Sequence, residues 1–229
     1  MRRTSLGIPA GQRPPDLERT QHGTGDCNGG EPMGRWIWIN RRYLWTAAVI
    51  FAVGMATGYL ASDSLRQVLM SQLTQIRDLA VQVRAVNNPA YTVMVIFLNN
   101  AKVAIFFLLT GIVAGIPAIV GVFGNGALIG FVLAMLHHQG VPVGSVLLYG
   151  ILPHGIFEIP AFLIAAAFGL KLGWGWWRPT NGYTRREAFF QGWRDAFRAA
   201  GVAVAMLAVA AVVEGTVTPY LLSRYVLQG

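Results

Sequence analysis

The sequence predicts an all-α membrane protein: a polytopic bundle of about five transmembrane helices, one of them broken, with additional amphipathic interfacial helices. Of its 229 residues, 54% are hydrophobic and only 12% are charged, a composition that does not fit a soluble globular domain. The charges are also unevenly spread, because between Asn88 and Leu170 only Lys102 and Glu158 carry one. That run is long enough for three crossings of a hydrocarbon layer about 30 Å thick, at about 20 residues each.

Residues 1–34 are predicted to be a disordered cytoplasmic segment, because they are rich in Gly, Pro and charged residues and nearly lack large apolar ones. Residues 35–229 then form the transmembrane domain. Its first span is expected at 43–61, too deep in the chain for a signal peptide and without a cleavage site. Cys27 is the only cysteine, which excludes a disulfide framework and a cysteine-rich metal site.

An amphipathic helix is predicted at 62–88, between the first two spans. Its apolar residues follow one another at spacings of four and three, which places them on one helical face: Leu69, Leu73, Ile76, Ala80 and Val83. We expect this helix to lie on the membrane surface or on neighbouring spans. A coiled-coil contact with a partner is the alternative, although the heptad pattern lasts few turns.

Four further spans are expected, at 91–113, 118–136, 143–172 and 201–222. A Gly-Ile-Pro sequence at 115–117 separates the first two of these, because proline cannot continue a preceding helix. The stretch 143–172 is too long for one ordinary crossing and too short for two. Leu-Pro-His-Gly interrupts it at 152–155, so we predict a helix that is broken at Pro153.

The orientation of the spans follows from Lys and Arg, which concentrate in cytoplasmic loops. Arginines precede the first span, and Lys171 with several arginines fills the loop between the last two spans. Because four spans separate these regions, both are predicted to be cytoplasmic, which places the C-terminus outside the cell membrane. All seven tryptophans fall in the same two regions, as expected for side chains that prefer the headgroup layer. This bias also accounts for the net charge of +8, so nucleic acid is not an expected partner.

An interfacial helix is predicted within the second of these regions, at 185–198. Phe189, Phe190, Trp193 and Phe197 share one helical face there, with arginines elsewhere. Such a pattern is typical of a helix that lies on an anionic membrane surface. The fifth span is expected to begin after it, at Gly201.

Few polar residues lie within the predicted spans, and each needs a reason, because a charge at the bilayer centre costs about 2.5–3.5 kcal/mol on insertion scales. They are Asn99, Asn100 and Lys102 in the second span, Asn125 in the third, His154 and Glu158 in the fourth, and Glu214 in the fifth. His154 and Glu158 are four residues apart and share a helical face. Two interpretations are open: a buried polar knot that fixes helix packing, or a site for a ligand, an ion or a proton.

A metal site is the most specific form of the second interpretation. His154 and Glu158 supply at most two ligands, with His137 or His138 as further candidates, and their spacing is not the zinc-protease pattern. His137 and His138 are expected instead in a solvated turn. We therefore predict no metal ion, no cofactor and no catalytic residue.

Helix packing accounts for other unusual residues of the spans. Asn99 and Asn100 are expected to bond to neighbouring helices, a contribution of about 1 kcal/mol each. Gly124, Gly126 and Gly130 give the third span a small-residue face, which lets another helix approach closely.

Three segments carry several motifs in series: FLNNAKVAIFFLLTGIVAGIPAIVGVFGNGALIG at 97–130, ILPHGIFEIPAFLIAAAFGLKLG at 151–173 and VVEGTVTPYL at 212–221. In this order they resemble the stage II sporulation protein M family of bacterial and archaeal membrane proteins. The resemblance implies that the family's recurrent positions in this chain are Asn100, Asn125, Gly126, His154, Gly155, Glu158, Pro160, Glu214 and Pro219.

The resemblance also implies a function. The family's namesake acts in engulfment during sporulation, as a membrane scaffold for stage II sporulation proteins D and P, which remodel peptidoglycan. By that resemblance, this chain is a non-enzymatic scaffold in contact with the lipid bilayer and with cell-wall-modifying proteins, and self-association is left open. The alternative is a small transporter or lipid-handling protein, whose substrate would lie beside Pro153, between His154, Glu158, Lys102 and Glu214.

Overall fold

The computed structural model describes residues 32–175, 177, 179, 182 and 184–225, and every secondary-structure element among them is helical. The predicted all-α class is therefore confirmed for the described residues. Five stretches are long and apolar enough to cross a membrane: Met33–Leu60 (α1), Pro89–Thr110 (α3), Ile116–His138 (α4), Val143–Trp174 and Arg185–Tyr225 (α7). The disorder predicted for residues 1–34 lies, for residues 1–31, outside the described residues.

The first helix begins at Met33, well before the predicted span at 43–61. The polar residues before 43 do not end this helix, because no Gly or Pro follows Gly34 until Gly54. The Asn40 side chain also donates a hydrogen bond to the Trp36 carbonyl of the preceding turn at 2.8 Å. The chain forms two compact units, of which the first ends at Asn40. The packing described below is that of the second unit, from Arg41 onward.

Local sequence signals set the ends of α3 and α4. The Asn88 side chain accepts hydrogen bonds from the Ala90 and Tyr91 amides at 3.0 and 3.3 Å, with Pro89 at the first helical position. Between the two helices, Gly115 adopts a positive φ of 71°, a conformation that glycine enters without steric cost. The Gly-Ile-Pro sequence therefore lies at the boundary between these spans.

The fourth span stays helical where the sequence predicted a break. It consists of Val143–Ser145 (α5), a π-helical segment Val146–Ile151 (η2) and Leu152–Trp174 (α6). The Leu152 amide donates to the Leu147 carbonyl, five residues earlier, which is the π-helical spacing. Pro153 then falls in the first turn of α6, where its missing N–H costs nothing. The interruption is thus a widened turn just before Pro153.

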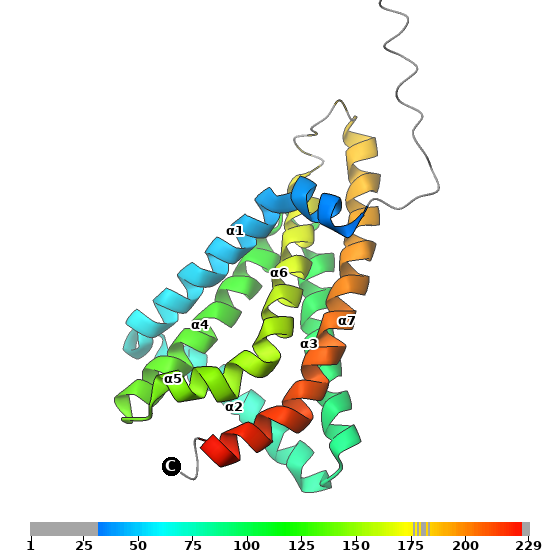
Figure 1. Cartoon of the computed structure of the whole chain (residues 1–229). Helices are drawn as coiled ribbons and strands as arrows, with labels where there is room; N and C mark the ends of the chain where they lie inside the picture. The colour runs from blue at the N-terminus through cyan, green and yellow to red at the C-terminus, as the bar shows by residue number, and fades with distance from the viewer. Residues whose placement is uncertain (1–31, 176, 178, 180–181, 183, 226–229) are drawn as a thin grey trace, which may run out of the picture. The chain divides into compact units, whose positions relative to one another are not determined.

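The predicted interfacial helix and the fifth span form one continuous helix, α7. Thr184 and Glu187 begin it with a reciprocal capping box: the Thr184 amide donates to Glu187 Oε2 at 2.8 Å, and the Glu187 amide donates to Thr184 Oγ1 at 3.3 Å. A lone Gly201 does not stop a helix in apolar surroundings. Toward its C-terminal end, where Pro219 lies inside it, α7 bends (Figure 1).

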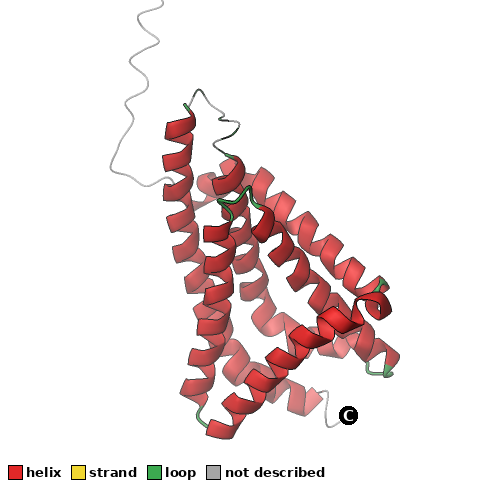
Figure 2. Ribbon diagram, turned by 180° about the vertical axis from the view of Figure 1, so that it is seen from behind, coloured by secondary structure: helices red, strands yellow, loops and turns green. Residues whose placement is uncertain are grey.

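Helix α6 packs against α3, α4 and α7, and its contact with α7 is the most extensive (Figures 1 and 2). Small residues bring these helices together, because in lipid the association of helices depends on close van der Waals contact. The fully buried alanines of α6 and α7 are Ala161, Ala165, Ala166, Ala167, Ala196, Ala199, Ala210 and Ala211. Between α3 and α6, side chains are absent where the backbones meet, at Gly111, Gly169 and Gly173.

The predicted amphipathic helix forms as α2, Ser62–Val86. Leu69 is buried against Ala127 and Phe131 of α4. Of the predicted apolar stripe, Val83 is also buried and Leu73 is half-buried, whereas Ile76 and Ala80 are exposed. The helix therefore packs on its neighbours through part of that stripe only.

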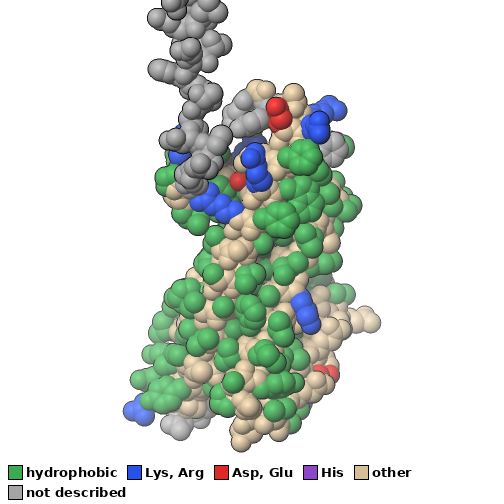
Figure 3. Space-filling view, turned by 90° about the vertical axis from the view of Figure 1, so that its right-hand side faces the viewer, with side chains coloured by type: hydrophobic (Ala, Val, Ile, Leu, Met, Phe, Trp, Pro, Cys, Tyr) green, Lys and Arg blue, Asp and Glu red, His purple; other side chains and the backbone are tan. Residues whose placement is uncertain are grey.

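The outer surface of the helices is largely apolar. Hydrophobic side chains cover most of the middle of the face in Figure 3, and many large ones are exposed on the spans. A soluble protein rarely exposes apolar surface of this extent. The described chain is thus built to be embedded in a membrane.

We predict that Gly126→Ala destabilises the protein whereas Gly124→Ala does not. A Cβ at Gly126 would overlap the backbone of Phe51 and Met55 in α1, while a Cβ at Gly124 would meet nothing within 4 Å. Overpacking costs about 1–3 kcal/mol, and alanine at an uncontacted helical site adds up to about 1 kcal/mol. Thermal unfolding of both variants in detergent checks this prediction, and equal midpoints would contradict the close α1–α4 contact.

Candidate functional site

Two helices bring together the ionisable residues of the fourth and fifth spans. His154 and Glu158 lie one turn apart on α6, and Glu214 and Thr218 lie one turn apart on α7. His154 Nδ1 is 3.3 Å from Thr218 Oγ1, and His154 Nε2 is 3.7 Å from Glu158 Oε2. One potential ligand atom from each of His154, Glu158 and Glu214 lies within 4.8 Å of the other two. We call these four residues the polar cluster.

Prolines interrupt the regular hydrogen bonding of both helices beside the polar cluster. Pro153 directly precedes His154, while Pro160 and Pro219 lie inside α6 and α7. Pro160 and Pro219 each lack the N–H that would bond to the carbonyl four residues earlier, and the π-helical η2 segment widens the backbone before Pro153. Irregular helices at membrane depth occur where they line a cavity or a protein-buried site. The irregular backbone and the ionisable side chains therefore coincide.

The polar cluster is half-buried and has two carboxyl groups. The His154 and Glu158 side chains are 16% and 20% exposed, and Thr218 is buried. Lys102, which the sequence placed beside them, is exposed on α3 and makes no ion pair with any described residue. Two carboxyl groups in apolar surroundings must therefore be neutralised by protons or by a cation.

The remaining residues predicted for the intramembrane site lie elsewhere. Asn99 is exposed and Asn100 half-buried on α3. Asn125 donates from Nδ2 to the Gly121 carbonyl of its own helix at 3.0 Å, and Gly126 contacts α1. The structure thus gathers His154, Glu158 and Glu214, with Pro160 and Pro219 on the same two helices, and among the described residues none of the others makes a hydrogen bond or ion pair with them.

His137 and His138 do not add ligands to the polar cluster. Both are exposed at the end of α4, and His137 Nδ1 is 2.6 Å from the hydroxyl oxygen of Tyr59 in α1. The sequence suggested them as further metal ligands beside His154 and Glu158. In the structure, Glu214 takes that third position.

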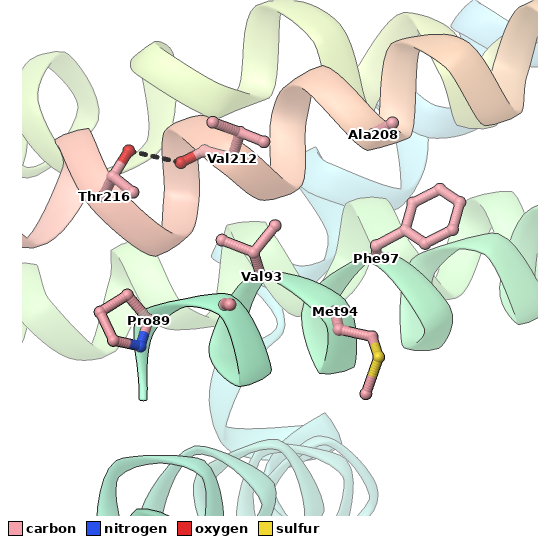
Figure 4. A pocket seen from close by; sticks show the side chains of 8 residues that line it. Pro89, Val93, Met94, Phe97, Ala208, Val212 and Thr216 are labelled. Atoms are coloured by element: carbon pink, nitrogen blue, oxygen red, sulfur yellow. Dashed lines mark hydrogen bonds between the residues drawn. The ribbon is translucent and has the colours of Figure 1, made fainter. Parts of the chain in front are cut away.

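An open apolar groove of about 490 Å³ lies between α3 and α7 (Figure 4). Val93, Met94 and Phe97 line it from α3, and Ala208 and Val212 line it from α7. Its polar group, the Thr216 hydroxyl, already donates to the Val212 carbonyl at 2.6 Å. The groove therefore offers surface for an acyl chain or an apolar side chain but no chemistry, and the polar cluster remains the candidate site.

Sequence reasoning missed a second polar contact between α6 and α7. Lys171 Nζ is 2.5 Å from Asp195 Oδ2, and Gln191 Nε2 donates to the same oxygen at 3.3 Å. The sequence places Lys171 among the charges of the loop between the last two spans, and it places Asp195 in the predicted interfacial helix. One signal could have identified Asp195: it lies on the face of α7 that carries the buried Gly192, Ala196 and Ala199. Thr218 could have been identified in a similar way, because it lies one helical turn after Glu214 and therefore on the same face of α7.

Comparisons with known proteins point to one family. The family model described as stage II sporulation protein M matches residues 47–219. A curated relative from Methanocaldococcus jannaschii, described as an uncharacterized protein, is 24% identical over 171 residues, which cover 75% of this chain and 90% of the relative. No solved structure matches the chain. The matched residues include the whole polar cluster.

We predict that Asp195→Leu destabilises the protein strongly and that Lys171→Met added to it restores most of the stability. Asp195 is 8% and Lys171 17% exposed in their side chains. Removal of one partner of a buried ion pair costs about 3–5 kcal/mol, whereas an apolar pair of similar volume is often neutral. Thermal unfolding of the single and double variants in detergent measures this difference. Additive losses in the double variant would contradict a coupled buried pair.

Proposed function

Because the chain belongs to the stage II sporulation protein M family, we propose that it is an integral membrane scaffold that holds peptidoglycan-remodelling proteins at the cell membrane during engulfment or a related envelope process. The proposed partners are stage II sporulation proteins D and P or proteins of the same kind. The scaffold catalyses no reaction itself. Its N-terminus lies in the cytoplasm and its C-terminus outside.

The observation that carries this proposal is the outward face of α3. Six of its exposed residues recur at spacings of three and four, which places them on one stripe of a helix, while Asn99 and Phe106 are exposed beside that stripe. The six residues are Tyr91, Met94, Leu98, Lys102, Ile105 and Leu109. We call these residues the α3 stripe. A second helix that packs against this stripe would meet side chains at the spacing that is typical of helix–helix interfaces.

Lys102 makes the α3 stripe more specific than a lipid-facing surface. It lies about 12 Å along the axis from the nearer end of α3, without an ion pair to any described residue. A charge at such a position is costly in hydrocarbon, and charged residues in spans pair with other charged groups. An acidic residue in the transmembrane helix of a partner would provide that pairing and fix its register.

A second copy of this chain is a less suitable occupant. Two copies that paired symmetrically through the α3 stripe would bring their Lys102 side chains to the same side of the interface, where like charges repel. A different partner with an acidic transmembrane residue is favoured by charge complementarity. Self-association through another face is unaffected by this argument.

Site-specific photocrosslinking in the native cells tests the proposal. We predict that a photoreactive residue at Leu98 crosslinks to a peptidoglycan-remodelling membrane protein, that Lys102→Leu reduces this product about tenfold, and that Lys102→Arg retains it because the charge is kept. Val53, an exposed residue of α1, is the matched control position. Absence of a protein crosslink at Leu98, or the same product from Val53, would contradict a docking role for the α3 stripe.

A small transporter is the second candidate function, and the polar cluster favours it. Ionisable side chains beside interrupted helices are the usual substrate or proton sites of transporters. Proteoliposomes that contain a pH-sensitive dye separate the two proposals. A transporter of protons would acidify the lumen under an imposed potential and would lose that activity in Glu158→Gln, whereas a scaffold would give no flux in either protein.

A further inference from the structure

We propose that His154, Glu158 and Glu214 bind one divalent metal ion of the Mn²⁺ to Zn²⁺ series, which links α6 to α7. This inference goes beyond the proposed scaffold function and does not depend on it, because it concerns the inside of the helix bundle and the partner surface lies on α3. It rests on three features of the polar cluster: the donor geometry, the histidine orientation and the charge balance.

The donor atoms already lie close to the separation that a metal ion requires. Ligands at about 2.0–2.2 Å from one ion lie about 3–3.5 Å from each other. His154 Nε2 and Glu158 Oε2 are 3.7 Å apart, and the donors of all three residues lie within 4.8 Å of one another. Small rotations of the flexible glutamate side chains would close the remaining gap without movement of either helix. Three protein donors leave a coordination position for water or another ligand.

The orientation of His154 matches that of a metal-binding histidine. Its Nδ1 lies 3.3 Å from the hydroxyl of Thr218, which is 6% exposed. A histidine ligand commonly donates its other ring N–H to a nearby acceptor, which fixes the ring and the tautomer. When the Nδ1–H group donates to Thr218 Oγ1, Nε2 carries the free lone pair, and this nitrogen is the one 3.7 Å from Glu158 Oε2. At 3.7 Å from Glu158 Oε2, Nε2 makes no hydrogen bond to that carboxyl group in this structure.

The charge of the polar cluster also favours a divalent cation. Glu158 and Glu214 would bring two negative charges into apolar surroundings. The two lysines of the spans do not balance them, because Lys102 is exposed on α3 and Lys171 is paired with Asp195, about 20 Å along α6 from Glu158. One divalent ion neutralises both carboxylates and uses the neutral histidine as a third ligand.

The donor types narrow the identity of the ion. Imidazole nitrogen is a favoured ligand of Zn²⁺ and other first-row transition metals, whereas Mg²⁺ and Ca²⁺ prefer oxygen ligands alone. A set of one histidine and two carboxylates therefore selects transition metals over the alkaline-earth ions. Because the ligands come from two helices, binding would also stabilise the α6–α7 contact by mass action.

Metal titration of the purified full chain in detergent tests the proposal, with Cys27→Ser as the background to remove thiol binding. After treatment with a chelator, the protein is titrated with Zn²⁺ or Co²⁺, and its metal content, its Co²⁺ absorption spectrum and its unfolding temperature are measured. We expect about one metal ion per chain, a rise in the unfolding temperature, and no comparable effect of Mg²⁺ or Ca²⁺. His154→Ala, Glu158→Gln and Glu214→Gln should each weaken binding about tenfold or more.

Two control variants keep the test decisive. Glu187→Gln changes an exposed carboxylate of α7, and His137→Ala changes an exposed histidine, so both should bind the metal as the background protein does. Thr218→Val retains the three donors and should weaken binding about tenfold through the loss of histidine orientation. A background protein that binds no Zn²⁺ or Co²⁺ would overturn the proposal. Equal binding by Glu158→Gln and by the background protein would overturn it as well.

Discussion

The close contact between α6 and α7 is the feature on which the rest of the structure depends. Lipid tails are as apolar as the helix surfaces, so the hydrophobic effect does not hold the two helices together. Buried alanines bring their backbones near one another, and a polar contact closes each end of the interface. Lys171 meets Asp195 at one end, and His154 meets Thr218 at the other. The alanines permit the approach, and the polar pairs select one register.

Much of the fold could be predicted from the sequence because lipid leaves a spanning chain few options. Backbone groups must be satisfied within the segment, so apolar stretches of this length form helices. The pairing of His154 with Glu158 could be predicted for the same reason, since a spacing of four is a property of one helix. The close helix contacts of Gly126 and Gly130 with α1 could be predicted as well, whereas Gly124 was wrongly included, because a Cβ there would meet nothing within 4 Å. The start of α1 at Met33 could not, because hydropathy marks the lipid region and not the helix end.

The sequence suggests Glu214 beside His154 and Glu158 as one alternative, but it does not fix the geometry of the polar cluster, which depends on how two helices meet. Alanine faces pack in many registers, so the distance between Glu214 and His154 and the contact with Thr218 could not be predicted. Counted on α6 alone, the donors number two, and on that count no metal site was expected. The contact with α7 adds Glu214 as a third donor. The exposure of Lys102 could not be predicted either, because it depends on which side of α3 packs against α6 and α7.

The two groups of polar residues would therefore serve different purposes. The polar cluster lies between helices, where a bound cation would stabilise the bundle, while Lys102 faces outward, where a partner helix would use its charge. In a scaffold, a rigid interior and a specific exterior complement each other.

Membrane-dye microscopy of a deletion strain during starvation tests this account most directly, with complementation by wild type, Lys102→Leu and Lys102→Arg at equal membrane levels. The account predicts that engulfment stalls at a flat septum and that wild type and Lys102→Arg restore it, whereas Lys102→Leu does not. Normal engulfment in the deletion strain, or full rescue by Lys102→Leu, would contradict it.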